Sequence, residues 1–216
     1  FNGDTWDFDS VLAKPPGTTP SLQGLSSTCA SSVFKMRELC TAHGRFISAL
    51  SAFLAAGNRA IFVMGNHDRE LAFEEVQEVL RSSLAATAPP GQGCAVAASI
   101  EFEPWFVYQP GLIYAEHGQQ YDTTCAYRDV LAPFCPPDDV ADKEIEASLG
   151  SVVSRRLLGG LGTINPFVDD SFLMSLSGYA KMMNSYRTAG RPFARLFLSQ
   201  TIRVFFELRS LRRRAL

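Results

Sequence analysis

The chain has 216 residues, 46% of them hydrophobic and 11% aromatic, a composition that excludes a disordered chain and is typical of a globular domain or a domain with a large insert. Its net charge is −2, but residues 1–150 hold 9 Lys and Arg against 19 Asp and Glu, whereas residues 151–216 hold 11 against 3. The acidic part suits cations, and the basic part suits phosphates, nucleic acid or an anionic membrane surface.

Two further classes are disfavoured by the residue pattern. The five cysteines are odd in number and have no C-x-x-C spacing, so neither a disulfide framework nor a zinc-thiolate site is indicated. No uncharged apolar run approaches the roughly 18 residues that span a bilayer, since the long uncharged stretch at residues 82–100 is interrupted by Pro89, Pro90 and Gly91. We therefore expect a cytoplasmic protein, with peripheral membrane contact as an added option.

The first predicted elements are a loop, a helix and a strand. Residues 11–28 are rich in Pro, Gly and polar side chains and are expected to form a loop. Residues 31–56 place apolar side chains at helical spacing and predict one long helix that stops at Gly57 and Asn58. Residues 59–64, RAIFVM, form a short apolar run and predict a buried strand.

The next elements complete an α/β pattern. Residues 69–86 predict a second helix, whose first turns are acidic, as the helix dipole favours, at Glu70, Glu74 and Glu75. Residues 95–116 alternate and are rich in aromatic side chains, which predicts two strands joined by a turn at Pro110 and Gly111. The order of elements predicts an α/β fold with a mixed sheet and helices outside it.

Three short motifs each follow a predicted strand. They are G-D-x-x-D at residues 3–7, G-N-H-D at residues 65–68 and E-H-G at residues 116–118. Since ligands of α/β sheets gather at the carboxyl ends of strands, we expect Asp4, Asn66 and His117 to meet at one point. A carboxylate, an amide oxygen and an imidazole suit Mn, Fe or Zn better than Ca.

At these motifs the chain resembles the calcineurin-like metallophosphoesterase family. The resemblance covers residues 1–122 and includes the second, third and fourth of the five motifs that mark the family. It implies a sandwich of mixed β-sheets flanked by helices and hydrolysis of phosphoesters by a dinuclear metal centre. The first motif, D-x-H, and the fifth, G-H-x-H, are absent from the sequence, which favours a fragment cut at both ends that is inactive by itself.

The resemblance also implies roles for individual residues. Asp4 would bridge two divalent ions, and Asn66 and His117 would hold the second of them. His67 would donate a proton or hydrogen bond to the leaving group, with Asp7 orienting its imidazole. Two ions lower the pKa of a bridging water and clamp the phosphoryl oxygens.

Other residues near the motifs have plainer interpretations. Asp4 alone is compatible with a turn, and His117 with a buried, hydrogen-bonded histidine. Asp68 is expected to steady its loop, and Asp122 either to support the site or to cap a helix. Where the family usually has Arg, the chain has Phe8, and Gln119 is assigned no ligand role. His43, inside the predicted long helix, is expected to be solvated or packed.

The basic C-terminal part requires a separate interpretation. We expect residues 1–137 to form a partial metallophosphoesterase core and residues 138–216 a helical insert or cap. The last predicted helix interleaves Phe and Leu with Arg, so it is either an ordinary packed helix or a surface that docks on anionic membranes and lipid-linked phosphoesters. Nucleic acid is not expected, since the aromatic residues follow a helical stripe. The alternative function is a catalytically decayed membrane-surface or scaffolding protein.

Overall fold

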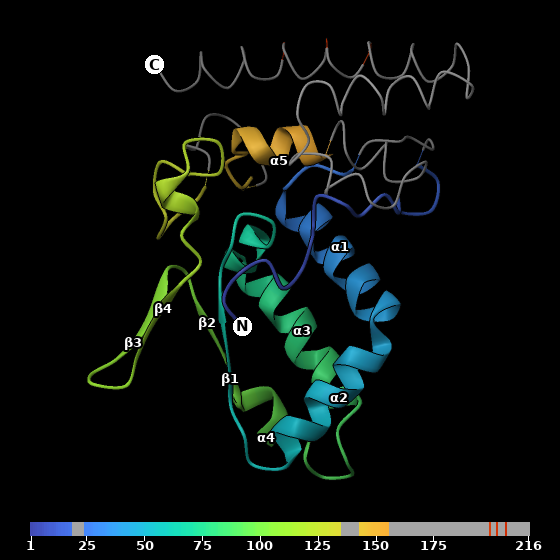
Figure 1. Cartoon of the computed structure of the whole chain (residues 1–216). Coiled ribbons are helices and arrows are strands. Elements are labelled where there is room, and N and C mark those ends of the chain that lie inside the picture. Colours follow the sequence, from blue (N-terminus) through green and yellow to red (C-terminus); the bar gives the residue numbers. More distant parts are fainter. Residues whose placement is uncertain (19–23, 135–142, 156–198, 200–201, 203–205, 207–216) are drawn as a thin grey trace, which may run out of the picture.

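The computed structural model describes residues 1–18, 24–134 and 143–155 and the single residues 199, 202 and 206. Over these residues the chain is a mixed α/β protein with helices and two small sheets (Figure 1). The expected domain boundary at residue 137, and most of the expected cap with its last basic helix, lie outside the described residues. Of the cap, the structure describes one short helix, α5 (Leu149–Val153). None of the described helices is long and apolar enough to cross a membrane.

The predicted long helix is two helices. The Thr28 side chain begins α1 (Cys29–Ala42) by accepting a hydrogen bond from a first-turn backbone N–H. The helix ends at His43, whose φ of −104° and ψ of 34° are not helical, and α2 (Gly44–Ala55) begins directly afterwards. Glycine stabilises helices poorly, which makes this junction a natural place for the break. The prediction of a single helix over residues 31–56 is therefore wrong, although nearly all of the segment is helical.

A parallel pair of strands forms the centre of the fold. As predicted, the apolar run after α2 is a buried strand, β1 (Ala60–Val63), and it pairs in parallel with β2 (Ile100–Glu103). The first residues of the chain lie along the other edge of β1, where Asn2 pairs in parallel with Val63. Three adjacent segments thus run in the same direction, and their carboxyl ends lie at one edge.

The connection from β1 to β2 is helical, as the α/β pattern predicts. It contains a 3₁₀ turn, η1 (Arg69–Ala72), then α3 (Glu74–Ala86) and α4 (Gly93–Ala98). The helix predicted over residues 69–86 is interrupted at Phe73, which is extended. Glu70 therefore lies in the separate 3₁₀ turn η1, and not in the first turn of a helix over residues 69–86, and its side chain is fully buried.

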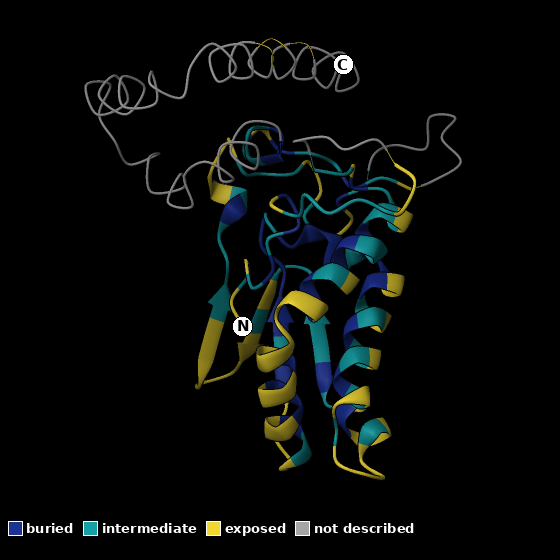
Figure 2. Ribbon diagram, turned by 90° about the vertical axis from the view of Figure 1, so that its right-hand side faces the viewer, coloured by how far each residue is buried: buried dark blue, intermediate teal, exposed yellow. Residues whose placement is uncertain are grey.

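The aromatic segment folds into a hairpin with its own small sheet. Strands β3 (Phe106–Gln109) and β4 (Ile113–Glu116) are antiparallel, and the turn between them contains Gly111 at φ +73°, where it was predicted. A short 3₁₀ helix, η2 (Gln119–Tyr121), follows. In the described residues the hairpin does not pair with β1 or β2, so the expected single mixed sheet is two separate sheets. The hairpin is largely exposed, and Figure 2 shows much of it in yellow.

The hydrophobic core lies among the helices and the parallel strands. Apolar side chains of α1, α2, α3, β1 and β2 form one buried cluster, which includes Met36, Leu50, Phe62, Leu80 and Ile100. Figure 2 shows the buried faces of these helices in dark blue and their outer faces in yellow. The packed helices hold β1 firmly, and β1 carries the G-N-H-D motif at its carboxyl end.

Candidate metal and phosphoester site

The three motifs converge at the carboxyl end of β1. The N-terminal segment leaves the sheet after Asn2 and enters Asp4, while β1 continues through Met64 into Asn66. The hairpin reaches the same place because the Asn2 side chain donates a hydrogen bond of 3.0 Å to the carbonyl of Glu116, the last residue of β4. His117 follows directly, so this bond connects two separate sheets at the site.

Two glycines allow the segments to approach one another. A Cβ on Gly3 would lie 2.4 Å from the His117 ring, and Gly3 also has φ +79°. A Cβ on Gly65 would lie 2.2 Å from Asp4 Oδ1 and 2.5 Å from the Asp4 backbone nitrogen. The glycines of the G-D and G-N pairs are therefore required by close packing. Asp4 is itself left-handed, with φ 49°, the only described non-glycine residue of that kind.

The side chains of Asp4, Asn66 and His117 are in contact. His117 Nε2 lies 3.2 Å from Asp4 Oδ2 and 3.3 Å from Asn66 Oδ1. Its other ring nitrogen, Nδ1, lies 2.9 Å from the carbonyl oxygen of Asn2. A carbonyl only accepts hydrogen bonds, so Nδ1 carries the hydrogen. The other nitrogen, Nε2, is left facing the two oxygen atoms Asp4 Oδ2 and Asn66 Oδ1.

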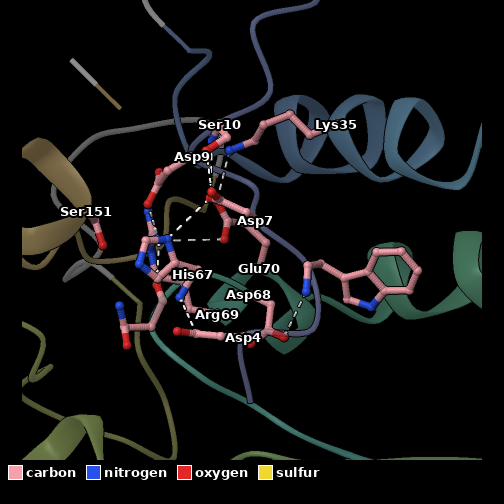
Figure 3. Close-up of polar contacts among 12 residues, drawn as sticks. Asp4, Asp7, Asp9, Ser10, Lys35, His67, Asp68, Arg69, Glu70 and Ser151 are labelled. Atoms are coloured by element: carbon pink, nitrogen blue, oxygen red, sulfur yellow. Dashed lines mark hydrogen bonds and ion pairs between the residues drawn. The ribbon is translucent and has the colours of Figure 1, made fainter. Parts of the chain in front are cut away.

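His67 and Asp7 lie near Asp4, as Figure 3 shows. His67 Nδ1 is 3.3 Å from Asp7 Oδ1, and Asp7 also accepts hydrogen bonds from the backbone N–H and hydroxyl of Ser10. The backbone N–H of His67 donates to Asp4 Oδ1 at 2.9 Å. The structure thus brings together the five residues that the sequence singled out: Asp4, Asp7, Asn66, His67 and His117.

The hydrogen bonds among these groups stabilise the charged forms of their side chains. The hydrogen bond to Asp7 raises the pKa of His67 to about 9 against the opposing effect of burial, so its imidazole is protonated at neutral pH. Burial by itself would raise the pKa of Asp4, but hydrogen bonds from His117 and the His67 N–H lower it below its ordinary value. The hydrogen bond to Asp4 in turn raises the pKa of His117. Asp4 and Asp7 are accordingly carboxylates at neutral pH.

Neighbouring residues have structural roles. Asp68 steadies its loop as expected, since its fully buried carboxylate accepts hydrogen bonds from the backbone N–H groups of Thr5, Trp6 and Gly65. Burial raises the pKa of this carboxyl to about 6. Phe8, where the family usually has Arg, is fully buried in the core and does not face the site.

The Asp122 side chain caps a turn, and not a helix as one of its two alternatives expected. Its carboxylate accepts hydrogen bonds from the backbone N–H and hydroxyl of Thr124, which closes a turn.

Gln119 is buried and donates to the Met64 carbonyl at 3.3 Å. His43 is exposed at the junction of α1 and α2.

A buried ionic network beneath the site was not predicted from the sequence. Arg69 contacts Asp9, and Lys35 contacts Glu70 at 2.9 Å, with all four side chains almost fully buried. Ser27 connects the two pairs, donating to Glu70 at 3.0 Å and accepting from Arg69 at 3.2 Å. The available signal was that Asp9 and Arg69 each follow a motif by one or two positions, but sequence alone does not give their burial.

The expected metal ligands are side chains of three different types, a carboxylate, an amide and an imidazole. Among the residues that the structure describes, no group of three or more His, Cys, Asp or Glu side chains is placed to hold a metal ion. The expected set has only one Asp and one His of these types, and its third member is the amide oxygen of Asn66. Comparison of the chain with protein-family models, with curated proteins and with solved structures found no match.

Proposed function

We propose that this chain is part of a metal-dependent phosphoester hydrolase of the calcineurin-like metallophosphoesterase type. Asp4, Asn66 and His117 would hold a divalent ion, and His67 would serve the leaving group, oriented by Asp7. The single observation that carries the proposal is the arrangement of oxygens around His117 Nε2, at 3.2 Å and 3.3 Å.

These distances fit ligands of one ion. Two ligands with bonds of about 2.1 Å lie roughly 3.0 Å apart at octahedral angles and about 3.4 Å apart at tetrahedral angles. The second ring nitrogen of His117 donates to a backbone carbonyl, which is the support that a metal-binding imidazole usually has. Without an ion, a proton on Nε2 can occupy the same position and pair with Asp4. The proposal is therefore tested by metal binding.

The donor types favour Mn, Fe or Zn, because one carboxylate, one amide oxygen and one imidazole make a site of intermediate hardness. Bound divalent ions supply Lewis acidity and an activated water to phosphoester hydrolysis. The described residues provide donors to one ion. A dinuclear centre would need further ligands, such as those of D-x-H and G-H-x-H motifs, and this sequence contains neither motif.

Two further side chains, His67 and Asp7, would then serve the leaving group. His67 is placed to donate its Nε2 proton to a leaving oxygen, since Nδ1 faces Asp7 and the ring keeps 30% of its side-chain surface exposed. Asp7 fixes the ring orientation and stabilises the imidazolium. The Asp4 side chain is also 31% exposed, so the site is open to a substrate.

The finer fold assignment belongs to the same proposal. The parallel order of the N-terminal segment, β1 and β2 is compatible with one sheet of a metallophosphoesterase sandwich, and the hairpin β3–β4 with part of a second sheet. Lipid-linked phosphoesters remain one proposed substrate class. They are suggested by the basic composition of residues 151–216, most of which lie outside the described part of the chain.

The test is calorimetric titration of the 216-residue chain with Mn²⁺, checked by the electron paramagnetic resonance of free Mn²⁺. We expect wild-type binding to be lost or weakened at least tenfold in Asn66→Ala and His117→Ala. His67→Ala should bind Mn²⁺ nearly as the wild type does, because His67 is a proton donor in this scheme. His43→Ala is the matched control, since it removes an exposed imidazole far along the chain from every motif.

Absence of Mn²⁺, Fe²⁺ and Zn²⁺ binding to the wild-type chain would refute the proposed metal site. Equal loss of binding in His67→Ala and Asn66→Ala would instead contradict the division of roles between the two neighbouring residues.

A further inference from the structure

Arg69 is a buried cation directly beneath the G-N-H-D loop. Its side chain is 1% exposed, and its two terminal nitrogens donate to the two carboxylate oxygens of Asp9 at 2.9 Å and 3.1 Å. A two-pronged contact of this kind fixes the guanidinium in both position and orientation (Figure 3). Asp9 lies two residues after Asp7, so the pair also connects the segment after the G-D-x-x-D motif to the G-N-H-D loop.

The same guanidinium holds the backbone of Asn66. Arg69 Nη1 donates to the Asn66 carbonyl oxygen at 2.8 Å, and the Tyr127 hydroxyl donates to that oxygen at 2.9 Å. A carbonyl oxygen has two lone pairs, so these two donors satisfy it completely. Tyr127 is 61 positions away in sequence, and its hydroxyl joins the segment after η2 to the loop.

The peptide bond that follows Asn66 is held from both sides. Its carbonyl accepts from Arg69 and Tyr127, and its N–H, which belongs to His67, donates to Asp4 Oδ1 at 2.9 Å. Because a peptide unit is planar, fixing its carbonyl also fixes the direction of its N–H. The orientation of this one peptide therefore fixes the backbone from which the Asn66 side chain starts and the donor that the Asp4 carboxylate accepts from.

We propose that Arg69 and Tyr127 are positioning residues for the candidate metal site, and that together with Asp9 they form a clamp on the Asn66–His67 peptide. The inference rests on the proposed function for its consequence, which is tighter metal binding. The clamp would act without touching the ion, by keeping Asn66 Oδ1 and Asp4 Oδ2 at the separation from His117 that one ion requires.

A purely structural role would need less than this arrangement. The Arg69 charge is already balanced by Asp9 at 2.9 Å and by Glu70 at 3.8 Å, and Glu70 also pairs with Lys35, so neutralising the guanidinium does not require its bond to the Asn66 carbonyl. The Tyr127 hydroxyl carries no charge, and the ring would pack in the same way without it. Removing the hydroxyl therefore tests the clamp while the ring keeps its packing, although it also ends the hydrogen bond between Tyr127 and the Ser151 side chain.

Tyr127→Phe is the primary variant, because it removes one oxygen and keeps the ring. Ser51→Ala is the matched control, since the Ser51 hydroxyl donates a buried hydrogen bond of 2.9 Å to the Leu84 carbonyl, inside the helical core and away from the site. Both variants lose one hydrogen bond to a backbone carbonyl, and Tyr127→Phe also loses the hydrogen bond between its hydroxyl and the Ser151 side chain. Arg69→Lys is the second variant, because it keeps the charge next to Asp9 and loses the planar fork.

Two readouts separate the clamp from stability. In calorimetric titration, the Mn²⁺ dissociation constant should rise about tenfold in Tyr127→Phe and more in Arg69→Lys, the usual range for residues that support metal ligands, and stay within twofold in Ser51→Ala. In ¹H–¹⁵N spectra of the metal-free chain, the His67 backbone amide and the Asn66 side-chain amide should shift in both clamp variants and not in the control.

Each outcome decides one question. If Tyr127→Phe matches Ser51→Ala in both readouts, the clamp is overturned and the network is only structural. If the wild type binds no metal, the proposed function fails, and the two amide resonances alone decide whether the clamp holds the peptide.

Discussion

Replacing Gly65 by alanine tests the close packing that unites two motifs. Gly65 does not have a positive φ, so alanine brings no backbone strain of the kind that Gly3 would meet. Its effect is steric, because the new Cβ would lie 2.2 Å from Asp4 Oδ1, 2.5 Å from Asp4 N and 3.0 Å from Asp4 Cγ. One of these atoms belongs to the backbone, so rotation of the Asp4 side chain alone does not relieve the clash.

The size of the effect follows from these distances. A carbon and an oxygen in ordinary contact are at least about 3.2 Å apart, so Asp4 must move away by about 1 Å. That displacement would lengthen a metal–oxygen bond from about 2.1 Å to about 3 Å, which ends coordination. Overpacking of this extent costs about 1–3 kcal/mol of unfolding free energy, or a fall in Tm of roughly 2–12 °C for a chain of this length.

The assay combines thermal unfolding with Mn²⁺ titration of the same samples. We expect Gly65→Ala to lower Tm and to weaken Mn²⁺ binding at least tenfold. Gly44→Ala is the control, since Gly44 has no atom within 4 Å of its added Cβ and does not have a positive φ. A Gly65→Ala chain that binds Mn²⁺ within twofold of wild type at unchanged Tm would show that the two motifs do not touch as described.

Three further outcomes follow from the same geometry. Gly3→Ala should lower Tm more than Gly65→Ala does, because it combines a 2.4 Å approach to the His117 ring with φ +79°; equal Tm values would contradict this order. Glu70→Gln should cost about 3–5 kcal/mol in denaturant titration at pH 7, since it leaves Lys35 buried without its anion. Arg69 and Lys35 hold the pKa of Glu70 well below 4.5 despite burial, so this difference should be largest above pH 4.5 and shrink as the pH falls below it. Titration with Mn²⁺ should give one ion per chain, because the described donors gather at one point, and a stoichiometry of two would require ligands outside that cluster.

The elements of the fold that follow from local patterns could be predicted. The apolar run before the G-N-H-D motif gave a buried strand, and Pro110–Gly111 gave a hairpin turn, because strand burial and turn chemistry depend on nearby residues. The break between α1 and α2 was missed, since apolar spacing continues across His43 and Gly44. The separation of the hairpin from the β1–β2 sheet was also missed, because strand pairing is not a local property.

Part of the candidate site could likewise be predicted from the sequence, and part of it could not. The expectation that strand ends share an edge selected Asp4, Asn66 and His117. For His117 the physical reason differs, because it follows β4 of the separate antiparallel hairpin and lies at the site next to the hydrogen bond from Asn2 to Glu116. The contribution of Tyr127 could not be found, because a lone tyrosine in a loop has no spacing to a motif. The sequence places Glu70 in a first helical turn, where the helix dipole favours acidic residues. Its burial beside Lys35 and Arg69 could not be predicted, because both partners come together with it only in the tertiary structure.

The acidic side chains around the site can be compared by the partner each one has. Asp9 has the guanidinium of Arg69, Asp68 has three backbone N–H groups, and Asp7 has His67 and Ser10. Hydrogen bonding accounts for all three without a ligand. Asp4 differs, because it adopts a left-handed conformation that costs free energy for a non-glycine residue and points Oδ2 at a ring nitrogen that also faces the Asn66 amide oxygen. Asp4 is also hydrogen-bonded, by the His67 N–H, so the proposed cation site rests on its strained backbone and on the two oxygen atoms that face His117 Nε2, and not on an unsatisfied carboxylate.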